Sequence, residues 1–436
     1  MSTGKSGRRE FLRRAGGAAV GALAAPYFIA SKALGDATTP PASERLTFGH
    51  IGVGGRGGQL LGGSFLPQPD VQVVAVCDPF QLKRDRWAEQ VDRHYSDRAG
   101  SSYQGCAAYN DFRELLARDD LDGVVIATHD GWHVPIAIAA ARAGKDLYVE
   151  KPLGLSVEQD KALRATLQRY QRIFQYGTQQ RSSAHCRFGC ELIRNGRIGK
   201  IESIEVVAPG GSAGGSTEPL PVPEGLDYDL WLGPAPYTPY TSDRCSTSAS
   251  YFVYDNSIGF LAGWGAHPLD ILDWAYGSDD MMPVAYEGTG VIPTEGLFDT
   301  VTTWDVTCRY PDGVPLLFTP GGDLTKFTGS EGWVAISRGG LDAEPKSLLS
   351  SVIAPDEVHL VESGDHARSF IEGMKTRTPA VSPIESAVRS DTISHLSDIA
   401  IRTGRKITWD PVREQIVGDP DASRLISRSI REPWRL

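Results

Sequence analysis

The stretch that decides the fold is LTFGHIGVGGRG, residues 46–57. Its first half predicts a β-strand, and its second half predicts a glycine-rich turn that leads into a helix. Gly52 permits a tight turn, Gly54 lets a pyrophosphate approach the backbone, and Gly57 lets the helix pack on the strand. The free N–H groups and positive dipole end of that helix suit a phosphate. The stretch therefore predicts a dinucleotide site.

A second stretch, VQVVAVCD at residues 71–78, predicts a buried strand that ends in an acid. Asp78 lies 21 residues after Gly57, which is about where a carboxylate binds the ribose hydroxyls of NAD. That charge would repel the 2′-phosphate of NADP, whereas Lys83 and Arg84, which follow closely, would attract it. We therefore expect NAD as the cofactor, with NADP as the less favoured alternative.

A third stretch, DLYVEKP at residues 146–152, places a lysine at the C-terminal end of another strand. Ligands of open α/β sheets bind at this edge. Residues 45–160 alternate strand and helix patterns, which predicts a Rossmann domain with a doubly wound parallel sheet. Residues 161–436 carry strand patterns at 200–208 and 300–319, rich in β-branched and aromatic residues, and predict an α+β substrate-binding domain of antiparallel strands.

The first 35 residues form a targeting segment that we exclude from the fold. Arg8 and Arg9 make a twin-arginine pattern, and residues 16–30 are small and apolar. This apolar run is short for a membrane span and suits a signal peptide. We expect export through the twin-arginine pathway, a periplasmic or cell-envelope location, and no stable membrane span after processing.

The charge balance limits the partners. Residues 1–35 carry a net charge of +5, which leaves −15 for the rest of a chain whose total is −10. An acidic mature protein argues against nucleic acid or an anionic membrane as a partner. The six cysteines show no zinc-ligand spacing, so we expect no metal site.

At Glu150-Lys151-Pro152 the chain becomes similar to a known family. Together with Ala127-Thr128, His133, YGTQQRS at 176–182 and WGAH at 264–267, this motif resembles the glucose–fructose oxidoreductase / inositol dehydrogenase (Gfo/Idh/MocA) family. The resemblance covers essentially the whole mature chain and is strongest to the exported bacterial branch. It implies a Rossmann domain, a large open antiparallel sheet behind it, a tightly held nicotinamide cofactor, a small sugar or polyol substrate and a homo-oligomer.

The resemblance also implies site residues. It places the catalytic lysine at Lys151 and a second catalytic group at His267. A lysine beside an oxidised nicotinamide feels a like charge, which lowers its pKa towards a useful acid–base range, and Pro152 permits a cis peptide bond. The cofactor-binding candidates are Gly52, Gly54, Arg56, Gly57, Asp78, Thr128, His133, Glu150 and Lys151. The substrate-binding candidates are Arg181, Trp264, His267 and Asp270.

Some of these roles have alternatives. His133 would contact the nicotinamide end or cap the following helix. Arg181 would clamp substrate or lie on the surface as an ordinary arginine. Trp264 would stack on a sugar or pack in the core, and Asp270 would contact substrate or serve as a structural acid inside a helix.

One position departs from the family pattern. Many relatives carry an Asp-x-x-x-His pair on one helix, where a spacing of four places both groups on one face. Here His267 is present but the aspartate position holds Gly263. Glycine cannot hold or orient a proton, so Lys151 and His267 remain as the proton-handling candidates.

Three functions follow from these observations. The first is an exported NAD-dependent oxidoreductase acting on a hydroxyl or keto group of a sugar, glycoside or polyol. The second is a redox-assisted glycoside lyase or hydrolase that recycles its NAD internally. The third is a non-catalytic NAD- or sugar-binding protein, which Gly263 keeps open.

Overall fold

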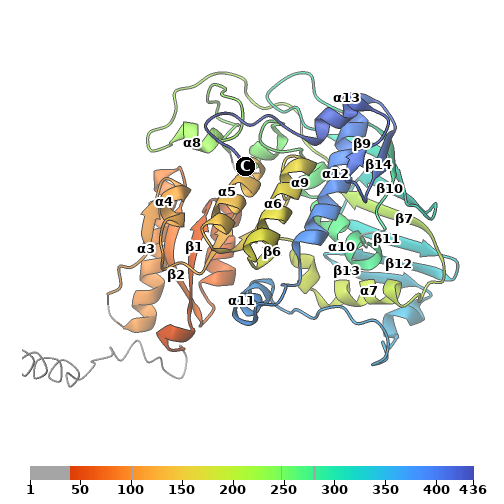
Figure 1. Ribbon diagram of the computed structural model, residues 1–436, viewed down its shortest axis with the longest axis horizontal. Coiled ribbons are helices and arrows are strands. Elements are labelled where there is room, and N and C mark those ends of the chain that lie inside the picture. Colours follow the sequence, from red (N-terminus) through yellow and green to blue (C-terminus); the bar gives the residue numbers. More distant parts are fainter. Residues whose placement is uncertain (1–39, 101, 247, 278–280) are drawn as a thin grey trace, which may run out of the picture. The chain divides into compact units, whose positions relative to one another are not determined.

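The computed structural model describes residues 40–436 except 101, 247 and 278–280 (Figure 1). The twin-arginine segment expected at residues 1–35 lies outside the described residues. Residues 46–436 group together by their contacts into one compact unit. Within the described part of the chain, no helix combines the length and the apolar character needed to cross a bilayer.

The first sheet has six parallel strands in the order β3-β2-β1-β4-β5-β6. The strands are β1 (Leu46–Ile51), β2 (Val71–Cys77), β3 (Ala107–Tyr109), β4 (Gly123–Ile126), β5 (Asp146–Val149) and β6 (Phe174–Tyr176). The strand order changes direction between β1 and β4, and ligands of such sheets bind outside the carboxyl ends of the strands at that point. The predicted doubly wound parallel sheet is confirmed. The expected domain boundary near residue 160 falls before β6, which pairs with β5.

Helices connect these strands as a parallel sheet requires. The connecting α-helices are α2 (Gly55–Leu60), α3 (Gln81–Ala99), α4 (Phe112–Leu116), α5 (Asp130–Arg142) and α6 (Val157–Tyr170). The Asp111 side chain caps α4 by accepting the Arg113 N–H, and Ser156 caps α6 in the same way. All four residues of β4 are buried, as expected for a strand that is covered on both faces.

The second sheet has nine strands in the order β13-β12-β11-β7-β10-β9-β8-β14-β15. The strands are β7 (Ile201–Ala208), β8 (Ala285–Val291), β9 (Thr303–Arg309), β10 (Pro315–Pro320), β11 (Leu324–Gly329), β12 (Gly332–Ser337), β13 (Gly340–Glu344), β14 (Ile407–Asp410) and β15 (Gln415–Ile416). All neighbours are antiparallel except β7 and β10, which are parallel. The antiparallel sheet predicted for this domain is therefore mixed at one pair.

One face of the second sheet is covered by helices. Burial alternates along β9, where Trp304, Val306 and Cys308 face a large apolar core. The helices α7 (Ala184–Arg194), α10 (Ala266–Tyr276) and α12 (Ile384–Thr403) contact this sheet, and Figure 1 shows them beside it. Because α12 also contacts α6 and β6 of the first domain, it joins the two sheets.

Shorter helices complete the chain. They are α8 (Tyr228–Leu232), α9 (Phe260–Gly263), α11 (His366–Thr376) and α13 (Pro420–Ser423), with the 3-10 turns η4 (Gln179–Ser182) and η5 (Ala249–Phe252). The glycine- and proline-rich stretch at residues 209–239 is loop apart from α8, as its composition predicts. The loops before α8 and around η5 matter here because they approach the carboxyl edge of the first sheet.

Candidate active site

The glycine turn has the shape that its sequence predicts. Gly52 has a φ of +81°, in the region that favours glycine. A Cβ added at Gly57 would lie 1.8 Å from the Gly52 carbonyl oxygen, so α2 packs against the turn only because residue 57 has no side chain. At Gly54 an added Cβ would meet only the Lys83 Nζ, at 3.8 Å. This turn therefore combines a tight bend, a close helix and open space over its second glycine.

A cleft opens beside this turn. Its wall comes from the ends of β1, β2 and β4, from α8 and from η5, and it includes Gly52, Gly54, Arg56, Asp78, Lys83, Thr128, Trp231 and Tyr251. The cleft thus lies at the carboxyl edge, where the strand order changes direction. Its place at this edge and its open space beside the glycine turn fit a dinucleotide.

Asp78 lies in the wall of the cleft with both carboxylate oxygens in use. Its Oδ2 accepts the Val53 N–H at 3.0 Å and its Oδ1 accepts the Phe80 N–H at 2.9 Å. Burial raises the pKa of this carboxyl, against the effect of nearby Lys83. Arg84 donates to the Asp78 carbonyl and to Asn110, whereas Lys83 lines the cleft. Asp78 and Lys83 therefore both line the cleft.

Glu150 and Arg56 form an ion pair at the end of β5. The Arg56 Nε donates to Glu150 Oε1 at 2.9 Å, and the Gln179 Nε2 donates to the same oxygen at 2.9 Å. Glu150 is buried, while Arg56 is partly exposed and lines the cleft. The acid therefore holds the arginine in the cleft wall.

Lys151 lies next to the helix pair that carries His267. Its Nζ donates to the Gly263 carbonyl oxygen at 2.6 Å. Gly263 ends α9, and His267 lies in the first turn of α10, with Trp264 and Gly265 between the two helices. The Lys151–Pro152 peptide bond is cis. The structure thus brings together the two residues expected to handle protons.

Both bases have lowered pKa values. Burial lowers the pKa of Lys151, although Glu150 and Asp130 oppose the change. Burial also lowers the pKa of His267 well below its usual value, and the charge of Lys151 adds to the effect. The buried Nδ1 of His267 has no hydrogen-bond partner among the described residues. The shift of the pKa favours a neutral ring for His267 and makes Lys151 easier to deprotonate than an exposed lysine, as a proton acceptor requires.

Thr128 and His133 occupy different places. Thr128 lines the cleft. His133 is buried outside the cleft wall, with Nδ1 at 2.7 Å from the Pro152 carbonyl oxygen and Nε2 at 3.2 Å from the Thr128 carbonyl oxygen. In the structure His133 therefore links the end of β4 to the loop that follows Lys151.

Arg181 and Asp270 meet each other in a buried ion pair. Arg181 Nε donates to Asp270 Oδ2 at 2.6 Å and its Nη2 donates to Oδ1 at 2.7 Å. Both side chains are almost fully buried, with exposed fractions of 4% and 1%. Their charges are therefore satisfied within the protein, and the pair joins η4 to α10.

Trp264 lies between His267 and a residue that the sequence did not single out. Its ring centroid is 5.5 Å from that of His267, and the Arg338 guanidinium lies 5.2 Å from the Trp264 ring. Tyr251 of η5 was also missed, although its ring lies 5.2 Å from the Lys151 Nζ. Neither residue belongs to a recognisable motif, because each comes from a loop or turn brought to the site by the fold.

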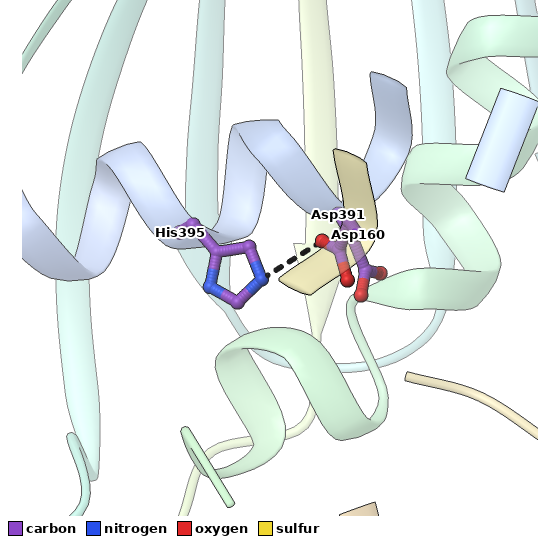
Figure 2. A group of neighbouring side chains, drawn as sticks. All are labelled: Asp160, Asp391 and His395. Carbon is purple, nitrogen blue, oxygen red and sulfur yellow. Dashed lines mark hydrogen bonds and ion pairs between the residues drawn. The ribbon is translucent and has the colours of Figure 1, made fainter. Parts of the chain in front are cut away.

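A second group of titratable side chains lies behind the Lys151 loop. We call Asp160, Asp391 and His395 the buried group (Figure 2). His395 Nε2 lies 3.2 Å from Asp160 Oδ2, and Figure 2 shows Asp391 and His395 on the same helix, α12. Asp391 accepts the Leu153 N–H at 2.6 Å and the Tyr176 hydroxyl at 2.8 Å. The group therefore fastens the loop after Lys151 to α12.

Comparison with curated proteins finds relatives over part of the chain. A glycosyl hydrolase family 109 protein from Shewanella sp. (strain ANA-3) is 35% identical over 178 residues, which are 38% of this chain and 38% of that relative. An α-N-acetylgalactosaminidase from Shewanella oneidensis is 34% identical over 178 residues, again 38% of each chain. The chain thus matches well under half of the length of these relatives.

Solved structures share the fold over most of the chain. An aldose-aldose oxidoreductase from Caulobacter crescentus has a TM-score of 0.61 at 18% identity, covering 84% of this chain and 99% of that one. A scyllo-inositol dehydrogenase from Lactobacillus casei, solved with NAD(H) and scyllo-inositol, has a TM-score of 0.59 at 16% identity over the same shares. At such identities the likeness shows the fold.

Family models match both parts of the chain. A model described as an NAD-binding Rossmann fold of the oxidoreductase family matches residues 46–178. A second, described as the C-terminal alpha/beta domain of that family, matches residues 212–436, which is more than half of the chain. The chain therefore belongs to the Gfo/Idh/MocA oxidoreductase family, a family of enzymes.

Proposed function

We propose that the chain is an exported NAD-dependent oxidoreductase that acts on a hydroxyl or keto group of a sugar, glycoside or polyol. The observation that carries this proposal is the Lys151 amine, 2.6 Å from the Gly263 carbonyl oxygen and next to the segment of His267, at the carboxyl edge of an NAD-binding sheet. The NAD(H)-bound inositol dehydrogenase among the structural neighbours supports a polyol or sugar substrate.

The protein's own residues would handle the proton of the reacting hydroxyl. Bound NAD supplies a hydride acceptor at this edge of the cleft. Lys151, whose pKa is lowered by burial, accepts the hydroxyl proton as the carbon loses its hydride. His267 holds the substrate oxygen or takes the proton onward, since burial keeps its ring neutral. In the reverse direction the same groups return the proton to a carbonyl oxygen.

Asp78 supports NAD over NADP. Its carboxylate lines the cleft and would repel a 2′-phosphate. Lys83 lines the same cleft and opposes this preference. We propose that the acid dominates because its two backbone hydrogen bonds fix it in the wall.

A second candidate function is a glycoside lyase or hydrolase that recycles its NAD. Transient oxidation of a sugar acidifies the neighbouring C–H bond, so that a glycosidic bond is eliminated and the hydride is then returned. The relatives named glycosyl hydrolase family 109 and α-N-acetylgalactosaminidase favour this candidate. Gly263 also favours it, since the proton-handling set differs from the Asp-x-x-x-His pattern.

The test begins with the cofactor that copurifies with the protein, released and identified by mass spectrometry. The holoenzyme is then incubated with scyllo-inositol, free aldoses, methyl glycosides and nitrophenyl α-N-acetylgalactosaminide. Sustained NADH formation supports the oxidoreductase. Release of nitrophenol without net NADH supports the lyase or hydrolase. Sugar binding with neither product leaves a non-catalytic binding protein and refutes both enzymatic proposals.

Export rests on the N-terminal sequence and is tested separately. The Arg8-Arg9 pair is the receptor-read part of a twin-arginine signal. Replacing both by lysine should leave the protein in the cytoplasm, as measured by cell fractionation. Replacing Arg13 and Arg14 by lysine is the control with the same change in composition. Normal export of the Arg8→Lys, Arg9→Lys variant would contradict the proposal.

A further inference from the structure

The side chain that would lie nearest to a Cβ at residue 263, where relatives carry the aspartate, is that of Tyr251. A Cβ added at Gly263 would lie 3.3 Å from Tyr251 Cδ1 and 3.6 Å from its Cε1. Tyr251 belongs to η5, a turn that precedes α9 in the chain. Its ring therefore borders the space into which an aspartate at residue 263 would extend.

Tyr251 also lies beside the lysine expected to handle the proton. Its ring centroid is 5.2 Å from the Lys151 Nζ, and the same ammonium donates to the Gly263 carbonyl. The ring lines the cleft together with Arg56 and Thr128. Tyr251 thus stands where the dinucleotide cleft meets Lys151.

The hydroxyl of Tyr251 is uncommitted, unlike those of several neighbours. Tyr148 accepts a hydrogen bond from Gln179, and Tyr254 donates one to Asp398. Among the described residues, no hydrogen bond to the Tyr251 hydroxyl is formed. Burial raises the pKa of this phenol, and the charges of Asp130 and Glu150 act in the same direction. The group therefore stays protonated and can donate.

We propose that Tyr251 is a catalytic residue, which donates a hydrogen bond to the reacting substrate oxygen from the place that Gly263 leaves open. This inference rests on the proposed function. When a hydroxyl is oxidised, its proton passes to the Lys151 amine and its carbon gives a hydride to the nicotinamide. Tyr251 keeps its own proton and stabilises the negative charge that builds on the oxygen during the transfer.

The first test removes only the hydroxyl. Tyr251→Phe should lower kcat by roughly 10²-fold, the usual effect of losing one donor to a developing oxyanion, with KM little changed. NAD content and melting temperature should match those of the wild type. Tyr254→Phe, three residues on, is the matched control and should retain wild-type turnover. A Tyr251→Phe enzyme with wild-type kcat overturns the proposal, as does a loss of turnover that merely follows loss of NAD.

The second test uses the geometry at residue 263. Gly263→Asp should lower turnover, because its Cβ crowds the Tyr251 ring at 3.3 Å. Tyr251→Ala should lower it as well. The double variant should recover about tenfold or more over Tyr251→Ala, since the carboxylate then has room to assist Lys151. If the losses of turnover in Gly263→Asp and Tyr251→Ala simply add in the double variant, the claim that the two side chains occupy the same space beside Lys151 is overturned.

A spectroscopic measurement separates this inference from the proposed function. On binding scyllo-inositol or the active glycoside, the wild type should show a near-ultraviolet tyrosine difference spectrum that Tyr251→Phe lacks and Tyr254→Phe retains. A difference spectrum that is identical in all three proteins overturns the role of Tyr251 alone. A wild type that forms neither NADH nor released aglycone, with every sugar supplied, instead refutes the proposed function.

Discussion

Two groups of titratable side chains contact the loop of residues 151–155, and they differ in how their polar atoms are used. Lys151, Tyr251 and His267, which we name the cleft group, include two polar atoms without a hydrogen-bond partner among the described residues, the Tyr251 hydroxyl and His267 Nδ1. Of the three residues, Tyr251 lines the cleft. In the buried group, both oxygens of Asp391 accept protein hydrogen bonds. Asp160 Oδ1 has no hydrogen-bond partner among the described residues, but it is packed closely against Gly154 and lies away from the residues that line the cleft. Perturbed pKa values mark both groups, so the perturbation alone does not locate the chemistry.

This difference shows that the hydrogen-bond partners of a buried titratable group determine its role in the protein. Asp391 holds the Leu153 N–H and the Tyr176 hydroxyl, and a Cβ added at Gly154 would lie 2.5 Å from Asp160 Oδ1. Such close packing leaves no room for a substrate. The buried group therefore fixes the loop that begins at Lys151.

The largest effect is expected from the cleft group. Lys151→Ala should lower turnover by roughly 10²–10⁴-fold, the usual range for losing a general acid or base. NAD should stay bound, because Arg56, Asp78 and the glycine turn remain. Steady-state kinetics and cofactor content measure the two effects. If the variant unfolds or loses NAD in proportion to activity, Lys151 belongs with the buried group and the comparison fails.

His267→Ala tests the second residue of the cleft group that is expected to accept a proton. The variant should also lose turnover, and by more than the same change in a relative with the aspartate, because Gly263 supplies no substitute. The pH profile of kcat/KM should lose an ionisation on its acid side, since the neutral ring is the active form. Arg338→Gln is a useful comparison, because that side chain stacks on Trp264 next to His267. An unchanged acid limb in His267→Ala would contradict its role as a base.

The buried group should instead control stability. Burial raises the pKa of Asp391 from 3.8 to about 7. Between these values the folded protein retains a proton that the unfolded chain has lost, so the stability supplied by this group falls as pH rises. The pKa of His395 is lowered from 6.5 to about 4, which acts in the opposite direction.

Asp391→Asn isolates the first of these effects. As the pH rises from 4 to 7, the free energy of unfolding of the wild type should fall relative to that of the variant. The fall should amount to up to about 4 kcal/mol for this pKa change. Denaturant titrations at several pH values measure it. Asp398→Asn, on the same helix but ion-paired with Arg402, is the control and should not show this loss. A pH-independent difference for Asp391→Asn would contradict the assignment.

Much of the fold could be predicted from the sequence because local signals agreed with the tertiary structure. The glycine turn follows a strand and precedes a helix, and Asp78 ends the next strand, as its position indicated. The N-terminal caps of α4 and α6 are Asp111 and Ser156, residue types that favour this position. The parallel contact of β7 with β10 was missed, because strand patterns give periodicity but not neighbours.

The site was less predictable, because its members meet only through the fold. Arg181 and Asp270 are 89 residues apart and pair in the interior, which neither residue's own neighbourhood indicates. Tyr251 lies on a turn without a motif. Two members of the buried group, Asp391 and His395, lie on α12, whereas Asp160 lies on α6. The serines of α12 hydrogen-bond to carbonyls of their own helix, so its polar sequence obscures how completely it is buried. Charge and spacing give candidates, whereas partners require the structure.

Asp78 sharpens the comparison because it shares features of both groups. Like Asp391, it is buried with both oxygens bonded, yet it lines the cleft. Asp78→Ala should therefore cost some stability, because two backbone N–H groups lose their acceptor. It should also raise the affinity for NADP relative to NAD, by about tenfold, which corresponds to about 1.4 kcal/mol.

The matched change is Lys83→Gln, which removes the opposing charge from the same wall and should shift the preference further towards NAD. Cofactor dissociation constants for both nucleotides, measured by titration calorimetry on cofactor-free protein, give the ratio for each variant, and thermal melts give the stability. Opposite shifts from the two variants would place Asp78 in the cleft group by function. A lower melting temperature of Asp78→Ala with an unchanged ratio of NADP to NAD affinity would place Asp78 with Asp391. Both oxygens of Asp78 accept backbone N–H groups, and in that case the acid would shape the cleft without selecting the cofactor.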